Sequence, residues 1–195
     1  MYHARRPELE APRRVIVIGS PGAEKGTLAR AIAERLKLPC IELERLYWRP
    51  GWRKPQADEW RAQVTELAAR EDWVMEGTFP STLDIRVARA DWLVYVDAPM
   101  PVCLIRKIKQ MMRGRGDPKA EVAPGCPQRL NGRLLRFIWN FPTSIGPRIN
   151  TIIARERRNR TIFILRTKRE QEEFLAKVPI LGDLGRDEPG PQQGG

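Results

Sequence analysis

Short apolar runs alternate along this chain with longer segments in which apolar residues recur at helical spacing. The short runs predict strands at residues 14–18, 39–43, 72–75, 92–97 and 161–166. The longer segments predict helices at 25–36, 57–70, 101–113, 127–139, 145–157 and 168–177. Apolar strands separated by helices are typical of a parallel sheet that is covered on both faces. We therefore expect an α/β fold with three layers and a five-stranded parallel sheet.

The two ends of the chain differ in composition from the segment between them. Residues 1–12 are polar and contain proline, and residues 181–195 end in a run of Pro, Gly and Gln, so we expect a flexible arm and a disordered tail. One domain is expected over residues 13–180. No apolar run approaches the roughly 18–20 residues of a membrane span, and the opening residues lack the apolar segment of a secretory signal. With three widely spaced cysteines, the sequence favours a cytoplasmic protein. It does not indicate the oligomeric state.

The strand–loop–helix segment at residues 14–36 contains the clearest candidate site. Its loop reads Gly-Ser-Pro-Gly-Ala-Glu-Lys-Gly-Thr and leads directly into a predicted helix. Backbone N–H groups at such a helix start surround phosphate groups, and the helix dipole favours negative charge there. Lys25 follows Gly19 by six residues, the spacing that lets its ammonium reach the β- and γ-phosphates. The predicted nucleotide-binding residues are Gly19, Ser20, Pro21, Gly22, Ala23, Glu24, Lys25, Gly26 and Thr27.

Positive charge is concentrated in one part of the chain. The formal net charge is +11, and residues 104–169 alone hold 17 Lys and Arg against 3 Asp and Glu. Such an excess predicts an anionic partner, either the phosphates of a nucleotide or a nucleic acid backbone; a solvated basic face is the alternative. Within this region, residues 113–127 are rich in Gly and Pro, which is compatible with a mobile lid or an ordinary surface loop.

The loop at residues 19–27 resembles the adenylate-kinase form of the phosphate loop, Gly-x-Pro-Gly-x-Gly-Lys-Gly-Thr. Other segments resemble a bacterial group related to adenylate kinase, often labelled DNA topology modulation proteins, and the resemblance covers roughly residues 13–178. The matching segments are Ile41-Glu-Leu-Glu-Arg-Leu-Tyr-Trp-Arg-Pro-Gly-Trp52, Trp73-Val-Met-Glu-Gly-Thr-Phe79, Arg89-Ala-Asp91, Asp97-Ala-Pro99, Ala123-Pro-Gly-Cys-Pro-Gln-Arg129 and Phe137-Ile-Trp-Asn-Phe-Pro142.

This resemblance implies a P-loop NTPase or nucleotide-kinase fold. It also implies transfer of the γ-phosphoryl group of ATP, with Mg²⁺, to a nucleotide or another small acceptor. Lys25 and the loop amides would then hold phosphates, and the Thr27 hydroxyl would support phosphate and Mg²⁺. Arg106, nine residues after Asp97, matches an arginine that related kinases set against the ATP base and phosphates.

Three further residues are assigned by the same resemblance. Glu44 keeps a carboxylate after the second strand, where it could orient or deprotonate an acceptor hydroxyl, or could be an ordinary solvated carboxylate. Glu76 stands where related kinases have Asp and could hold Mg²⁺ through water. Arg113 would help to neutralise phosphate charge.

Two positions depart from the pattern. Glu24 replaces a glycine that often has a positive φ, at a cost of about 1–3 kcal/mol for a non-glycine residue. Its carboxylate would repel a triphosphate by about 3 kcal/mol at ~6 Å, and it could pair with Lys25. Gln110 stands where related kinases often have a second arginine, for which Lys109 or Arg113 could substitute. The alternative function is therefore an impaired nucleotide-binding protein whose basic half binds nucleic acid.

Four aromatic residues follow the second predicted strand: Tyr47, Trp48, Trp52 and Trp60. They could line an acceptor pocket, or they could pack helices against the sheet.

Overall fold

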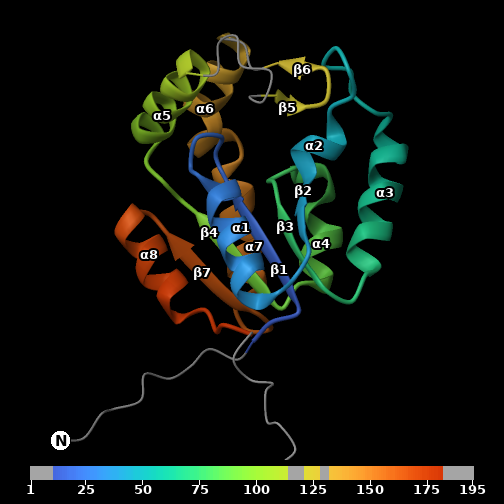
Figure 1. Cartoon of the computed structure of the whole chain (residues 1–195), viewed down its shortest axis with the longest axis vertical. Helices are drawn as coiled ribbons and strands as arrows, with labels where there is room; N and C mark the ends of the chain where they lie inside the picture. Colours follow the sequence, from blue (N-terminus) through green and yellow to red (C-terminus); the bar gives the residue numbers. More distant parts are fainter. Residues whose placement is uncertain (1–10, 114–120, 128–131, 182–195) are drawn as a thin grey trace, which may run out of the picture.

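The computed structural model describes residues 11–113, 121–127 and 132–181. Its centre is a five-stranded parallel sheet in the order β2-β3-β1-β4-β7 (Figure 1). The strands are β1 Arg14–Gly19, β2 Cys40–Glu42, β3 Trp73–Glu76, β4 Trp92–Val96 and β7 Thr161–Leu165. This arrangement confirms the predicted α/β fold with a five-stranded parallel sheet.

Helices cover both faces of the sheet and make it the middle of three layers (Figure 1). The helices are α1 Lys25–Leu36, α2 Leu43–Tyr47, α3 Ala57–Ala69, the 3₁₀ turn η1 Pro80–Thr82, α4 Leu83–Arg89, α5 Met100–Arg113, α6 Gly132–Ser144, α7 Gly146–Glu156 and α8 Lys168–Lys177. Strand β1 alternates between two buried clusters: Val15 and Val17 pack with α1 and α8. Ile16 and Ile18 pack with α3, α4 and α7. This alternation follows from the two-residue period of a strand.

Two predicted elements differ from the structure. The predicted helix at 127–139 begins only at Gly132 and continues to Ser144, because Pro127 belongs to a hairpin of β5 (Glu121–Ala123) and β6 (Cys126–Pro127). The predicted strand at 39–43 ends at Glu42, and the buried Leu43 already belongs to the short helix α2. Helices α2 and α4 have five and seven residues, too few to give a clear helical repeat in the sequence.

The hairpin includes the described part of the predicted lid. It is attached to the segment after α2, because the Gly51 amide donates to the Gly125 carbonyl at 3.0 Å. The Cys126 thiol donates to the Arg49 carbonyl at 3.2 Å. Residues 114–120 of the predicted lid lie outside the described residues, so closure of a lid stays a prediction.

Most of the predicted arm and tail also lies outside the described residues. Leu181, which the sequence assigns to the tail, packs on the domain: its amide donates to the Arg35 carbonyl at 2.8 Å. Across the described part of the chain, no helix is both long and apolar enough to cross a membrane.

Candidate functional site

The phosphate loop joins β1 to α1 and is held close to α5. At Gly22, φ is +85°, and an added Cβ would lie 2.2 Å from the Cys103 carbonyl oxygen, so a side chain at this position would collide with the α5 backbone. Glu24 has φ 66° and ψ 25°, the left-handed conformation that a glycine adopts without strain. The sequence prediction that a non-glycine residue occupies a strained position of the loop is therefore confirmed.

Lys25 crosses the loop instead of pointing into solvent. Its ammonium lies 3.3 Å from the Glu76 carboxylate and 3.3 Å from the carbonyl oxygen of Ser20. Both charged side chains are nearly buried, with 13% and 10% of their surfaces exposed. Glu76 reaches Lys25 because β3 is the neighbour of β1 and pairs Glu76 with Val17. The ammonium is thus positioned at the carboxyl edge of the sheet.

Glu24 pairs with Arg106, not with Lys25. The Arg106 guanidinium on α5 lies 3.5 Å from the Glu24 carboxylate, and the two side chains are 30% and 40% exposed. The pairing of Glu24 with Lys25 that the sequence left open is therefore wrong. Arg106, the predicted partner of the nucleotide, is held by a carboxylate of the phosphate loop itself.

The N-terminus of α1 offers hydrogen-bond donors to an anion. The Glu24 side chain makes no capping hydrogen bond, and the first turn of α1 holds no acidic residue. The first N–H groups of a helix have no partner inside the helix, and they favour phosphate. Thr27, in this first turn, is exposed and lines the adjoining cleft.

The donor set at this end of the sheet fits Mg²⁺ bound together with a nucleotide. The Thr27 hydroxyl and the Glu76 carboxylate line the same cleft. The described residues contain no cluster of three or more His, Cys, Asp or Glu that could hold a metal ion. Mg²⁺ in nucleotide sites takes only one or two protein carboxylates and fills its shell with water and phosphate oxygens. Glu76 and Thr27 are therefore the kinds of protein ligand that such a Mg²⁺ site needs.

A threonine after β3 fixes the start of the phosphate loop. The Thr78 hydroxyl donates to the Gly19 carbonyl at 2.6 Å and accepts from the Gly19 amide at 3.0 Å. Sequence reasoning missed this residue, because its partner lies 59 positions earlier in the chain. The two hydrogen bonds tie the end of β1 to the loop after β3.

Arg86 on α4 holds the loop after β3 through hydrogen bonds to its carbonyl groups. The residue is fully buried, and its guanidinium donates to the carbonyls of Gly77, Thr78 and Phe79 at 2.7, 2.7 and 3.1 Å. Burial lowers the pKa of the Arg86 guanidinium, and the negative charge of Glu76 opposes this shift. Sequence reasoning missed Arg86 as well, because nothing in a short helix marks one arginine as buried.

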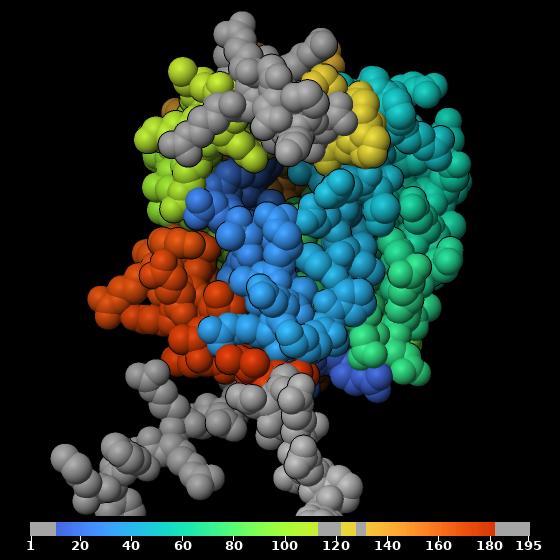
Figure 2. Space-filling view, in the orientation of Figure 1, coloured from blue at the N-terminus to red at the C-terminus, as the bar shows by residue number. Residues whose placement is uncertain are grey.

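A cleft runs from the phosphate loop to α2, and Figure 2 shows it as a hollow above α1, beside α5. Glu44 lies in the first turn of α2, is exposed and lines the cleft as predicted. Glu42, at the end of β2, lines it too and pairs with Arg30 at 2.6 Å. Sequence reasoning did not assign Glu42, although its place at a strand end was a usable signal. The cleft therefore brings predicted phosphate-binding groups and two carboxylates together.

Helix α5 lines the cleft with basic and amide side chains. Arg106, Lys107, Lys109 and Gln110 all face it. The Lys107 ammonium donates to the Gln110 amide oxygen at 3.1 Å. The side chain of Arg113 lies outside the described residues, so its predicted role stays a prediction.

The four aromatic residues Tyr47, Trp48, Trp52 and Trp60 do not all have the same role: some line the cleft, and one packs in the core. Trp60 is 3% exposed and packs with Tyr47 and Phe79, with ring centroids 5.0 and 5.2 Å away. Trp48 and Trp52 contact each other at 5.2 Å and line the cleft, as does Tyr47. Packing thus accounts for Trp60, whereas the other three rings form an apolar wall.

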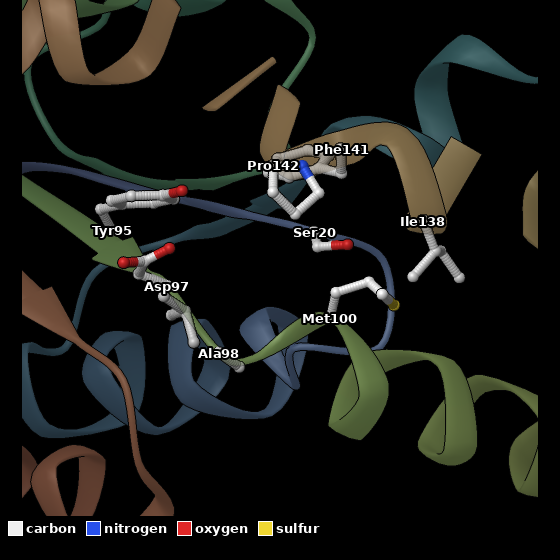
Figure 3. Close-up of a pocket in the computed structure, with 9 residues that line it drawn as sticks. Ser20, Tyr95, Asp97, Ala98, Met100, Ile138, Phe141 and Pro142 are labelled. Atoms are coloured by element: carbon white, nitrogen blue, oxygen red, sulfur yellow. The ribbon is translucent and has the colours of Figure 1, made fainter. Parts of the chain in front are cut away.

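A small cavity of about 30 Å³ lies behind the phosphate loop. Figure 3 shows Tyr95 and Asp97 on one side of it and Ile138 of α6 on the opposite side, with Ser20 and with Phe141 and Pro142 of α6 between them in this view. Burial raises the pKa of the Tyr95 hydroxyl. This volume is close to the space that one water molecule occupies in the liquid, which is far too small for a nucleotide.

The phosphate loop, the strand order and the flanking helices together define the fold of P-loop kinases. Among solved structures, the chain is similar to a shikimate kinase from Bacteroides thetaiotaomicron (17% identity, TM-score 0.54), covering 86% of this chain and 96% of that one. A shikimate kinase from Acinetobacter baumannii in complex with shikimate is similar at 18% identity and TM-score 0.54, over 86% and 90% of the two chains.

A gluconokinase from Sinorhizobium meliloti also matches, at 17% identity and TM-score 0.52, over 87% of this chain and 91% of that one. At such identities the likeness shows the fold. No protein-family model matches the chain, and no curated protein sequence matches it. The narrower resemblance to DNA topology modulation proteins stays a prediction.

Proposed function

We propose that this protein transfers the γ-phosphoryl group of Mg·ATP to a small acceptor, a nucleotide or another small molecule. The observation that carries the proposal is one shared cleft: Lys25 and the open N-terminus of α1 face it together with the carboxylates of Glu42 and Glu44. Phosphate donors and an acceptor need this kind of common space for an in-line transfer.

In the nucleotide half of the cleft, the amides of the phosphate loop and the Lys25 ammonium hold the phosphates. Lys25 exchanges its contacts with Glu76 and Ser20 for phosphate oxygens. Mg²⁺, when bound there, would supply neutralisation of phosphate charge. Thr27 and Glu76 are the residues that would hold it, Glu76 through a water molecule.

In the acceptor half, Glu44 orients the attacking hydroxyl and takes its proton. The acceptor oxygen forms a bond to the γ-phosphorus while the bond from this phosphorus to the bridging oxygen of ADP breaks, and ADP leaves. The rings of Tyr47, Trp48 and Trp52 exclude water from one wall. The names of the similar solved structures, shikimate kinases and a gluconokinase, support a small molecule as acceptor.

The basic segment also supports a nucleotide as the anionic partner. Arg106, Lys107, Lys109 and Arg133, all from the basic segment 104–169, line the cleft. Part of the charge excess that could have indicated a nucleic acid therefore faces the proposed phosphate site. A nucleic-acid partner would predict salt-sensitive DNA binding that survives Lys25→Ala.

The test is formation of ADP from ATP by the full chain with a panel of acceptors: nucleoside monophosphates, hydroxy acids and sugars. We expect acceptor-dependent ADP formation that falls at least a hundredfold in Lys25→Ala, and about as far in Glu44→Gln. Lys177→Ala, on the exposed surface of α8, serves as the matched control and should leave the rate unchanged. ADP formation that is equal in the natural chain and Lys25→Ala would contradict the proposal.

A further inference from the structure

We propose that Lys107, held in place by Gln110, is the side chain that balances the negative charge on the phosphoryl group during transfer. This inference rests on the proposed function, since it assigns a role within the same cleft. It makes Lys107 a catalytic residue and Gln110 its positioning residue.

The packing of α5 sets the direction in which Lys107 points. Cys103, four residues earlier on α5, is fully buried, and its carbonyl lies where a Cβ of Gly22 would be. Residues four apart share one face of a helix, so Lys107 lies on the face of α5 that contacts the phosphate loop. Met111, four residues later, is 4% exposed and belongs to the same face. Lys109, by contrast, is exposed.

A hydrogen bond to Gln110 fixes the position of the Lys107 ammonium. Lys107 is half-buried, and its ammonium donates to the Gln110 amide oxygen at 3.1 Å. Both residues line the cleft. An amide oxygen accepts this hydrogen bond without neutralising the charge, so the full positive charge stays available to a substrate. An arginine at position 110, as in related kinases, would repel Lys107 instead.

Lys107 lies among charged groups from both halves of the cleft. Its ammonium interacts electrostatically with the carboxylates of Glu44 and Glu76 and with the ammonium of Lys25. These groups belong to the acceptor half and the phosphate half of the cleft, so Lys107 lies within range of both. Burial lowers the pKa of Lys107, while Glu44 opposes this shift. A partly desolvated cation gains more from a new negative partner than one in water does.

During transfer, Lys107 donates a hydrogen bond to an equatorial oxygen of the phosphoryl group as negative charge is redistributed there. It keeps all its protons, because the acceptor proton passes to Glu44. Its contribution is electrostatic, and removal of one such donor typically lowers a rate about 10²–10³-fold. The structure therefore gives this role to Lys107 and not to Lys109, which the sequence suggested as a substitute for the missing arginine.

The test uses the complex of ADP, Mg²⁺ and aluminium fluoride, which mimics the phosphoryl group in transfer and is called ADP–fluoride below. We would measure by calorimetry its affinity and that of Mg·ATP for the natural chain, Lys107→Gln, Lys107→Arg, Gln110→Ala and Gln110→Glu. Lys107→Gln should weaken ADP–fluoride binding about a hundredfold and Mg·ATP binding less than threefold. Lys107→Arg should retain most of the affinity. Lys177→Gln, on the exposed surface of α8, is the matched control and should bind both probes as the natural chain does. Lys109→Gln is measured as well, because Lys109 also lines the cleft.

Gln110 has its own prediction. Gln110→Ala should weaken ADP–fluoride binding roughly tenfold, since the ammonium loses its orientation. Gln110→Glu keeps an accepting oxygen but pairs a negative charge with the ammonium, so it should weaken this binding at least as much. A purely structural role would instead weaken both probes equally. Unchanged binding in Gln110→Ala, beside a loss in Lys107→Gln, would remove the positioning role.

Each remaining outcome separates the inference from the proposed function. If the natural chain binds neither Mg·ATP nor ADP–fluoride, the proposed function fails, and the inference fails with it. If the natural chain binds Mg·ATP but Lys107→Gln binds ADP–fluoride equally well, only the inference is overturned. The inference is also overturned if Lys109→Gln shows the selective loss, or if ADP–fluoride binds no more tightly than ADP alone.

Discussion

Replacing Glu24 by glycine should make the phosphate loop bind Mg·ATP more tightly. The substitution replaces a strained non-glycine residue in the left-handed region, where φ is 66°, and removes a carboxylate from the helix start at which we propose that phosphate binds. It also releases Arg106 from its 3.5 Å ion pair. Loss of the carboxylate favours a bound nucleotide, whereas relief of the backbone strain raises the stability of the fold.

The charge effect is the larger one for affinity. An unscreened carboxylate ~6 Å from one phosphate charge costs about 3 kcal/mol at an effective dielectric constant near 20. Glu24 is 40% exposed and paired with Arg106, so solvent and the guanidinium reduce this cost. We expect roughly 1–2 kcal/mol, which is about a tenfold gain in affinity.

The backbone effect is the smaller one and acts on stability. A non-glycine residue in the left-handed region costs about 1–2 kcal/mol of stability. The greater freedom of glycine in the unfolded chain offsets roughly 0.4–1 kcal/mol of the gain from its removal. The free energy of unfolding should therefore rise by about 1 kcal/mol, which raises the melting temperature by about 2–4 °C.

Calorimetry with Mg·ATP and thermal melts separate the two effects if Glu24→Gln is measured beside Glu24→Gly. Glu24→Gln removes the charge and keeps the strained backbone, so it should gain most of the affinity and none of the stability. Glu34→Gln, also on α1 but exposed and far along the helix, controls for the change in net charge. Unchanged ATP affinity in both Glu24 variants would refute the reasoning.

Three further predictions concern the residues that support the loop. Thr78→Val removes both hydrogen bonds to Gly19, so it should lower the free energy of unfolding by about 2 kcal/mol and weaken Mg·ATP binding severalfold. Thr78→Ser should change neither quantity. Equal effects of the two variants would contradict this prediction. Arg86→Met leaves buried carbonyls unpaired, so it should lower the free energy of unfolding, measured in urea titrations, by about 3 kcal/mol. The control Arg89→Met should lower it by less than about 1 kcal/mol. Burial raises the pKa of the Cys103 thiol, so a thiol reagent at about pH 8 should label Cys103 only when the chain is unfolded in urea, as followed by mass spectrometry. Rapid labelling of the folded chain would contradict this, because it would show that α5 moves away from the loop.

The sheet and the long helices could be predicted because their signals are local. Residues 25–36 and 168–177 form helices with the predicted bounds. The start of the predicted helix at 127–139 was wrong for a non-local reason: Cys126 is buried against the segment after α2, which fixes a hairpin before the helix begins. No periodicity in the sequence reports such a contact.

The candidate site divides in the same way. The loop at residues 19–27 and its lysine are recognisable from spacing alone, since one strand and one helix position them. The pairs of Lys25 with Glu76, Glu24 with Arg106 and Gly19 with Thr78 each join distant parts of the chain. They depend on the order of strands and on how closely α5 approaches the loop. Only the three-dimensional structure provides that information.

The most direct measurement of the central claim is the calorimetric titration of Mg·ATP into the full chain. We expect one binding site per chain and at least tenfold weaker binding for Lys25→Ala, whose fold should be intact by circular dichroism. The absence of both binding heat and a thermal shift in the natural chain, or equal affinity in Lys25→Ala, would contradict it.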